Sequence, residues 1–236
     1  YTIRTEMAML TGLSDEELGF DRFDPYRRGE RFAGASLARR LAAKGYRTLF
    51  LHPFHAGFYR RDAVMPALGF ERFLDIDDFV GAPHVGPHVS DAALAERILA
   101  EIDATAGPVF VYAVTMENHG PWHDGRIVPG AGASAQYLAH LANGDRTLGD
   151  LAAGLAARGQ SWLLAFFGDH PPILPDHSRP AEQTTPAEQT TPAEQTTPHI
   201  LLTSNAADPS PALRRTPAEL SRLIAGRIFE PVSNAG

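Results

Sequence analysis

Short apolar runs alternate with amphipathic stretches along the chain. This alternation is typical of an α/β protein with a mostly parallel central sheet flanked by helices. Four runs predict strands, at residues 46–52, 108–115, 161–167 and 199–203. The runs PVFVYAVT (108–115) and SWLLAFF (161–167) are almost continuously apolar, so we expect both strands to be buried and the first to be central.

Helices are predicted between these strands, and their ends carry the usual signals. The predicted helices cover residues 5–13, 33–44, 90–106, 135–158 and 216–228. Gly12 and Gly45 stand where glycine commonly ends a helix. Ser90 and Asp91 can cap free amides at the start of the third helix.

One segment breaks the alternation, because residues 180–198 contain the hexapeptide PAEQTT three times in succession. This period is too short for a repeat with its own core, and proline every six residues prevents a long helix. We therefore expect an inserted flexible loop. Local duplication without a function explains it more simply than a binding role, because loops tolerate insertion.

Length and composition narrow the possible functions. The 236 residues suffice for one large domain or two small ones, and we predict a single catalytic domain over residues 1–236. The formal net charge of -7 argues against a nucleic-acid binder. The absence of cysteine excludes disulfides, thiolate metal sites and cysteine nucleophiles. No stretch approaches the ~20 apolar residues of a membrane span, and no signal peptide is visible.

Two of the predicted strands end in a polar turn with a histidine, and ligands of open α/β sheets bind at the carboxyl ends of strands. Asp169 and His170 follow the strand at 161–167, and their oxygen and nitrogen atoms suit a divalent metal. His119 follows the strand at 108–115 and can bind an anionic oxygen or donate a proton. A hydrogen-bonded surface turn and a turn-capping histidine are equally good alternatives.

Two further clusters can bind an anion. His52 ends the strand at 46–52, and Arg60 and Arg61 follow it with guanidinium groups that match phosphate or sulfate oxygens. A solvated basic loop fits these residues equally well. Thr2 stands at a helix start, where free amides favour an anion, and metal coordination can activate its hydroxyl as a nucleophile. Taken alone, Thr2 is more simply an N-cap.

The order of these clusters resembles the alkaline phosphatase and sulfatase superfamily, and within it the lipoteichoic acid synthase-like phosphoglycerol transferases. TIRTE at residues 2–6, followed by LTGL at 10–13, is similar to the nucleophile helix of that branch. The segment 52–62 resembles its substrate-binding histidine and arginine. ENHGPW at 117–122 resembles its substrate-side histidine turn, and GDHPP at 168–172 its metal-binding pair.

The resemblance implies an alkaline phosphatase-like fold and a metal-dependent phosphoryl-group transferase or hydrolase that acts on phosphate, or sulfate, esters. The implied roles are a metal-bound nucleophile for Thr2, metal ligation for Asp169 and His170, substrate binding for His52 and Arg61, and both substrate binding and catalysis for His119. Manganese is the expected metal, with zinc, magnesium or calcium as alternatives. The cysteine nucleophile of many sulfatases is absent, which favours phosphoryl transfer.

The resemblance also implies substrates and a location. We expect a phosphoglycerol- or phosphoethanolamine-type group to pass from a phospholipid or glycan ester to a cell-envelope glycan or lipid, outside the cytoplasm and at the cell membrane. The acidic metal ligand on the first strand of the family would precede Tyr1. We therefore expect the chain to be a fragment of a longer protein, in which this strand and a membrane anchor lie upstream of Tyr1.

Three other functions fit the same residues. The first is a sulfatase or phosphodiesterase-type hydrolase. The second is an anion- or glycan-binding domain that has lost catalysis, which metal titration would distinguish. The third is a metal-free hydrolase with His119 as the base, which is less favoured because no Ser-His-Asp arrangement is suggested.

Overall fold

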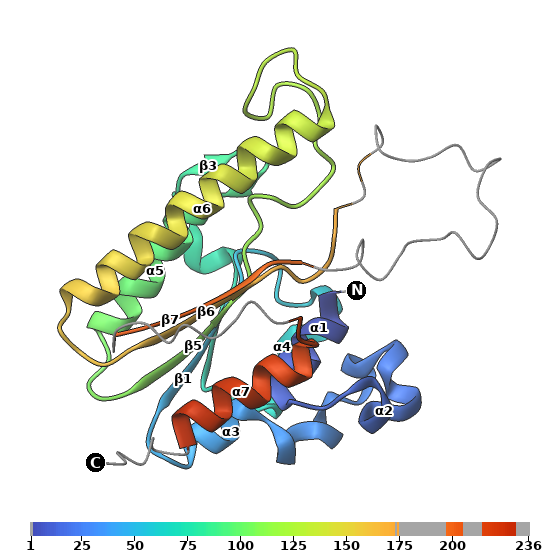
Figure 1. Ribbon diagram of the computed structural model, residues 1–236, viewed down its shortest axis with the longest axis vertical. Helices are drawn as coiled ribbons and strands as arrows, with labels where there is room; N and C mark the ends of the chain where they lie inside the picture. Colours follow the sequence, from blue (N-terminus) through green and yellow to red (C-terminus); the bar gives the residue numbers. More distant parts are fainter. Residues whose placement is uncertain (1, 173, 175–196, 205–213, 230–236) are drawn as a thin grey trace. The chain divides into compact units, whose positions relative to one another are not determined.

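The computed structural model describes residues 2–172, 174, 197–204 and 214–229 (Figure 1). These residues belong to two compact units. The first unit comprises Tyr1–Asp77, Ile102–Ala113 and Ala207–Gly236, and the second comprises Asp78–Glu101 and Val114–Ala206. The PAEQTT segment predicted as a loop lies outside the described residues, apart from Thr197 and Pro198.

The first unit is built on a three-stranded parallel sheet. Strand β1 (Arg47–Leu51) lies between β2 (Arg72–Leu74) and β5 (Val109–Ala113). Its residues 48–51 are buried; Leu49, Phe50 and Leu51 are apolar, and Thr48 donates its Oγ1 hydroxyl to the carbonyl oxygen of Gly69 at 2.8 Å. The strands predicted at 46–52 and 108–115 are therefore confirmed. The prediction of a buried central position for the second is wrong in this sheet, because β5 lies at its edge and is mostly half-buried.

Helices supply the rest of the core of this unit, and α1 and α7 pack side by side (Figure 1). The α-helices are α1 (Thr2–Thr11), α2 (Asp15–Leu18), α3 (Leu37–Ala42), α4 (Arg61–Ala67) and α7 (Pro217–Phe229). The 3-10 helices are η1 (Gly19–Phe23), η2 (Pro25–Ala35), η3 (Phe58–Arg60) and η4 (Ile76–Phe79), the last of which crosses into the second unit. Fully buried side chains of this core include Met7, Leu10, Leu41, Phe50, Met65 and Leu68.

The prediction of one helix over residues 33–44 is wrong. Its first three residues belong to η2, and α3 begins only at Leu37. Between them, Ser36 has a ψ of 128°, and its Oγ donates to the carbonyl oxygen of Leu68 at 2.5 Å. This hydrogen bond to a residue 32 positions away overrides the local preference for helix.

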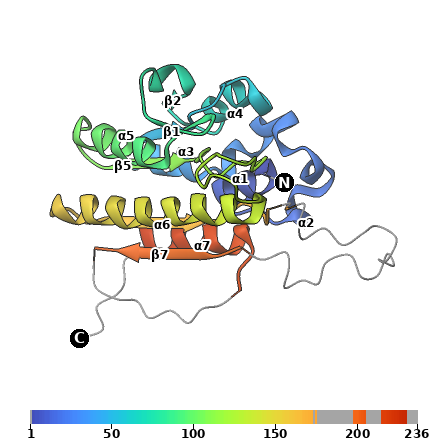
Figure 2. The same cartoon turned by 90° about the horizontal axis from the view of Figure 1, so that it is seen from above.

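The second unit combines two helices with two antiparallel strand pairs. The pairs are β3 (His84–Val85) with β4 (His88–Val89), and β6 (Leu163–Phe167) with β7 (His199–Thr203). Helices α5 (Asp91–Asp103), whose last two residues belong to the first unit, and α6 (Ala133–Ala157) run side by side (Figures 1 and 2). The strands predicted at 161–167 and 199–203 are confirmed, although β6 is half-buried where a buried strand was expected.

Candidate active site

The predicted nucleophile, Thr2, is the first residue of α1 and is half-buried. The backbone amides at this end of a helix have no intrahelical partner, and the helix dipole makes it electropositive. α1 ends as predicted, because Gly12 adopts a φ of 70° and donates its amide to the carbonyl oxygen of Ala8 at 2.8 Å. Thr2 therefore lies where an anion is favoured.

One turn further along α1, Glu6 forms a buried cluster. Its carboxylate accepts from Arg61 Nε at 3.1 Å and from Arg61 Nη2 at 2.5 Å, and Tyr26 Oη donates to its Oε2. All three residues are 1–2% exposed. Burial, and then the Glu6 charge, raise the pKa of Tyr26 well above its ordinary value, so its hydroxyl remains a donor. The cluster joins α1 to α4, and contact of Arg61 with a substrate stays a prediction.

His52 directly follows β1, and a turn with an unusual backbone conformation precedes Arg61. His52 is 2% exposed, and its amide donates to the carbonyl oxygen of Leu74 at 2.9 Å. Tyr59 and Arg60 have φ values of 57° and 58°, a left-handed conformation that side chains other than glycine rarely adopt. Asparagine adopts this conformation more readily than arginine does, so Arg60 is an unusual residue at this turn.

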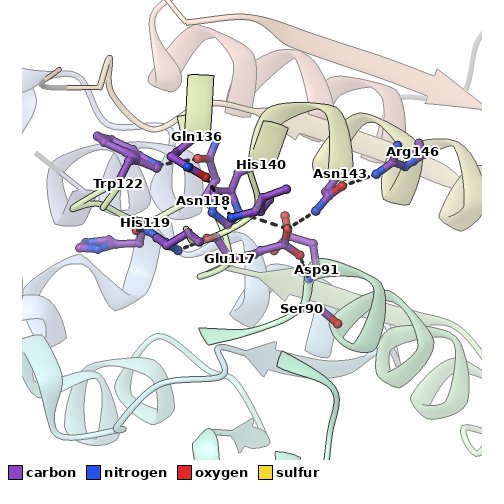
Figure 3. Close-up of polar contacts among 12 residues, drawn as sticks. Ser90, Asp91, Glu117, Asn118, His119, Trp122, Gln136, His140, Asn143 and Arg146 are labelled. Carbon is purple, nitrogen blue, oxygen red and sulfur yellow. Dashed lines mark hydrogen bonds and ion pairs between the residues drawn. The ribbon is translucent and has the colours of Figure 1, made fainter. Parts of the chain in front are cut away.

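In the second unit, the turn that carries His119 is built around Glu117 (Figure 3). Glu117 is 2% exposed. Its Oε2 accepts from the amide of Asp91 at 2.9 Å, and its Oε1 accepts from Asn143 Nδ2 at 2.7 Å and lies 3.3 Å from His140 Nδ1. The carboxylate therefore connects the start of α5 with the middle of α6.

Arg126 holds the backbone of the same turn. Its Nη2 donates to the carbonyl oxygen of Glu117 at 2.7 Å. Its Nη1 donates to the carbonyl oxygens of His119, at 2.7 Å, and Pro121, at 3.0 Å. One guanidinium thus fixes three carbonyl groups around His119.

The imidazole of His119 is exposed, and the backbone sets its tautomer. Its Nδ1 lies 2.7 Å from the carbonyl oxygen of Gly120. Because a carbonyl only accepts, Nδ1 carries the proton and Nε2 of the neutral ring presents its lone pair. The ring of His88 lies 6.0 Å away between centroids, and burial, followed by the Arg126 charge, lowers the pKa of His88 to about 4. His119 can therefore take part in general acid–base chemistry beside a neutral histidine.

Asp91 and His140 complete the surroundings of Glu117. Burial, and then the Glu117 carboxylate, raise the pKa of Asp91 from 3.8 to about 7. Asp91 Oδ1 and His140 Nε2 are buried and make no hydrogen bond within the described part of the chain. Burial also lowers the pKa of His140. The sequence indicated Asp91 only as a helix cap, and it carried no signal for His140, Asn143 or Arg126.

The predicted metal ligands Asp169 and His170 follow β6 after a single residue, Gly168. Asp169 Oδ2 lies 3.4 Å from His170 Nε2, and the two side chains are 39% and 46% exposed. His170 Nδ1 lies 3.1 Å from the carbonyl oxygen of Pro171, and a proton on Nδ1 would leave the Nε2 lone pair for a ligand. A carboxylate oxygen and an imidazole nitrogen fit a divalent cation in their donor chemistry.

The six predicted site residues fall into two groups. Thr2, His52 and Arg61 belong to the first unit, and His119, Asp169 and His170 to the second. Across the described residues, no group of three or more Asp, Glu or His side chains could hold a metal ion. Coordination of one cation by Thr2, Asp169 and His170 therefore stays a prediction. None of the helices in the described ranges is long and apolar enough to span a membrane.

Comparison with known proteins identifies the class. Residues 1–222 match the Sulfatase family, so the chain belongs to this family, as the resemblance predicted. It is 37% identical to the capsular polysaccharide biosynthesis protein RkpI of Rhizobium meliloti (strain 1021) over 183 residues, which are 76% of this chain and 34% of RkpI. It is 31% identical to a putative cyclic beta-1,2-glucan modification protein of the same organism over 185 residues, which are 73% of this chain and 29% of that protein. The chain spans about a third of the length of these relatives.

Solved structures share the fold. The lipoteichoic acid synthase LtaP of Listeria monocytogenes matches with a TM-score of 0.62 and 22% identity, over 84% of this chain and 52% of LtaP. The phosphoglycerol transferase GacH of Streptococcus pyogenes, in complex with sn-glycerol-1-phosphate, matches with a TM-score of 0.66 and 20% identity, over 85% of this chain and 55% of GacH. The predicted α/β fold of the alkaline phosphatase type is confirmed.

Proposed function

We propose that this chain is the catalytic region of a metal-dependent enzyme that transfers a phosphoglycerol- or phosphoethanolamine-type group to a cell-envelope glycan or lipid through Thr2. The observation that carries the proposal is the Sulfatase family match over residues 1–222, together with a threonine at the first residue of α1 and the pair Asp169 and His170 after β6. Cysteine, the nucleophile of many sulfatases, is absent from the chain.

The names of the relatives support the substrate class. Two curated relatives are named for capsular polysaccharide biosynthesis and cyclic beta-1,2-glucan modification, and both names point to a glycan. A structure with the same fold is that of a phosphoglycerol transferase with sn-glycerol-1-phosphate. A membrane-attached position outside the cytoplasm belongs to the same proposal and rests on the resemblance.

The reaction then has two halves. In the first, the Thr2 hydroxyl oxygen attacks phosphorus and releases its proton to water, the bond from phosphorus to the donor oxygen breaks, and protonated His119 gives its Nε2 proton to that leaving oxygen. In the second, an acceptor hydroxyl attacks phospho-Thr2 and passes its proton to Nε2 of His119, while the bond from phosphorus to the Thr2 oxygen breaks and that oxygen takes a proton back from water. Water in place of the acceptor hydroxyl gives a hydrolase.

The remaining residues have positioning and electrostatic roles in this proposal. His52 and Arg61 hold the anionic group. Glu6 engages Nε and Nη2 of Arg61, so the proposal assigns Nη1, which lies 3.5 Å from the carbonyl oxygen of Phe58, to a substrate oxygen. A divalent cation, when bound, supplies charge neutralisation and a lower pKa for the nucleophilic hydroxyl. Thr2, Asp169 and His170 are the residues proposed to hold it.

The test compares variants at Thr2 in the full-length protein, with Mn²⁺ and either a phospholipid donor or an aryl phosphate ester. We expect Thr2→Ala to lose turnover and the phosphorylated adduct that mass spectrometry detects on the peptide, and Thr2→Ser to keep part of both. Thr216→Ala is the matched control, because Thr216 is a hydroxyl residue at the start of α7 whose Oγ1 accepts from the Glu219 amide at 3.2 Å. Turnover that survives Thr2→Ala contradicts the nucleophile assignment.

A further inference from the structure

Glu117 lies two residues before His119, and each group that hydrogen-bonds its carboxylate within the described residues can act as a donor. The donors are the amide of Asp91 at 2.9 Å, Asn143 Nδ2 at 2.7 Å and His140 Nδ1 at 3.3 Å (Figure 3). A carboxylate satisfies three donors with two accepting oxygens, whereas an amide would place its own NH₂ group against a donor. The surroundings therefore select glutamate at this position.

Burying the Glu117 carboxylate in the core costs desolvation free energy. It is 2% exposed, and replacing buried charged groups by apolar ones of similar volume is often neutral or stabilising. Its hydrogen bonds come from two different helices, α5 and α6, and they fix both oxygens. They therefore determine the direction in which the chain leaves Glu117 toward His119, which an apolar side chain would not do.

Arg126 fixes the same turn from its other side. Its guanidinium binds the carbonyl oxygens of Glu117, His119 and Pro121 at 2.7, 2.7 and 3.0 Å. The amide of His119 in turn donates to the carbonyl oxygen of Met116 at 3.0 Å. The main chain of the histidine is thus held in both directions, while its imidazole is exposed.

We propose that Glu117 and Arg126 are positioning residues that hold the His119 imidazole in the orientation and tautomer that proton transfer needs. The inference rests on the proposed function, in which Nε2 of His119 exchanges a proton with a substrate oxygen. Neither residue touches the reacting atoms. Both act through the turn, because the carbonyl of Gly120, which binds Nδ1 of the ring at 2.7 Å, is part of the backbone that they hold.

The first test exchanges donor and acceptor in the hydrogen bond between Glu117 and Asn143. Glu117→Gln places an NH₂ group against a donor, and we expect kcat of the full-length enzyme to fall about tenfold to a hundredfold with a smaller change in KM. The double variant Glu117→Gln/Asn143→Asp moves the carboxylate to position 143 and preserves the net charge. The amide introduced at position 117 is then able to donate to the carboxylate introduced at position 143, and we expect kcat to recover most of the loss.

A mutant cycle separates positioning from general damage. If Glu117 acts through His119, Glu117→Gln adds no further loss of kcat to the His119→Asn variant, because the group that it positions is gone. Glu101→Gln is the matched control, since Glu101 on α5 is also a buried carboxylate and accepts from Arg97 Nε at 2.9 Å, outside the His119 turn. We expect this control to keep kcat.

Amide hydrogen exchange provides a readout that does not depend on turnover. We expect residues 116–122 of the full-length protein to exchange faster in Glu117→Gln, and to return to the wild-type rate in the double variant. Additive losses in the cycle, or unchanged exchange in a folded Glu117→Gln, overturn the inference. If the wild-type protein is inactive, only the proposed function is contradicted. The exchange data still decide whether Glu117 holds the turn that carries His119. Arg126→Gln replaces Glu117→Gln in both measurements if the latter does not fold.

Discussion

At the scale of single residues, Glu6 and Arg61 show how a charge is kept inside the first unit. Both are almost fully buried, and two hydrogen bonds, at 3.1 and 2.5 Å, join guanidinium and carboxylate. Tyr26 donates a third to the same carboxylate. Removing one partner of such a pair leaves an uncompensated buried charge, which costs far more than the pair itself contributes.

We therefore expect Arg61→Met to lower the free energy of unfolding by about 3–5 kcal/mol, because Glu6 is left buried and unpaired. Urea denaturation measures the loss. Arg47→Met is the control, since Arg47 forms an exposed pair with Glu71 at 2.9 Å and should cost less than about 1 kcal/mol. The double variant Glu6→Gln/Arg61→Met should regain stability, because no charge is left buried without its partner. Its turnover should still be lost, because the guanidinium proposed to bind the substrate is missing. Turnover in the stable double variant would contradict substrate binding by Arg61.

Asp91 and His88 give the second unit a pH dependence of two opposite signs. The pKa of Asp91 is raised from 3.8 to about 7, so the folded state binds the proton more tightly, and stability is lost as pH rises through that range. The pKa of His88 is lowered from 6.5 to about 4, so its contribution is lost as pH falls through that range.

We expect Asp91→Asn, which keeps the neutral form, to gain stability over the wild type as pH rises from 4 to 7, by at most about 4 kcal/mol. His88→Gln should instead gain over the wild type as pH falls from 6.5 to 4. Urea midpoints measured across this range test both variants. A difference between Asp91→Asn and wild type that does not change with pH would contradict the raised pKa.

At the scale of elements, the apolar pattern predicted the strands and most helices, because the apolar residues that define each of these elements are close together in the sequence. Residues 49–51 of β1 form one apolar run and are buried, as such a run requires. The helix predicted at 33–44 failed because the hydroxyl of Ser36 bonds Leu68, a partner that no local pattern reveals. The antiparallel pairing of β6 with β7 likewise depends on contacts between strands about 30 residues apart.

Two glycines of α6 distinguish helix propensity from helix packing. A Cβ at Gly149 would meet nothing within 4 Å, whereas a Cβ at Gly154 would lie 2.7 Å from Leu99 of α5. We expect Gly149→Ala to stabilise by about 0.5–1 kcal/mol through helix propensity. Gly154→Ala should lose that gain, because Leu99 must move. Thermal unfolding compares the two, and an equal rise in Tm would contradict close packing of α5 on α6.

At the scale of the whole molecule, the candidate site combines residues that sequence reasoning could and could not find. Asp169 and His170 are neighbours in the chain after an apolar run, so their chemistry is visible locally, and the family resemblance assigned it. The partners of Glu117 are invisible in this way, because they lie 23 to 26 residues away on two helices. Local strings thus reveal the groups that we propose to contact a metal or a substrate, whereas packing reveals the groups that hold them.

Metal removal tests the proposed coordination of one cation by Thr2, Asp169 and His170. If Thr2, Asp169 and His170 bind one cation, chelation should abolish turnover of the full-length protein, and added Mn²⁺ should restore it. Asp169→Asn and His170→Asn should each weaken Mn²⁺ binding at least about tenfold, measured by calorimetry, whereas Asp150→Asn on the exposed side of α6 should not. Turnover that survives both chelation and Asp169→Asn would instead favour the metal-free hydrolase, in which His119 acts as the base.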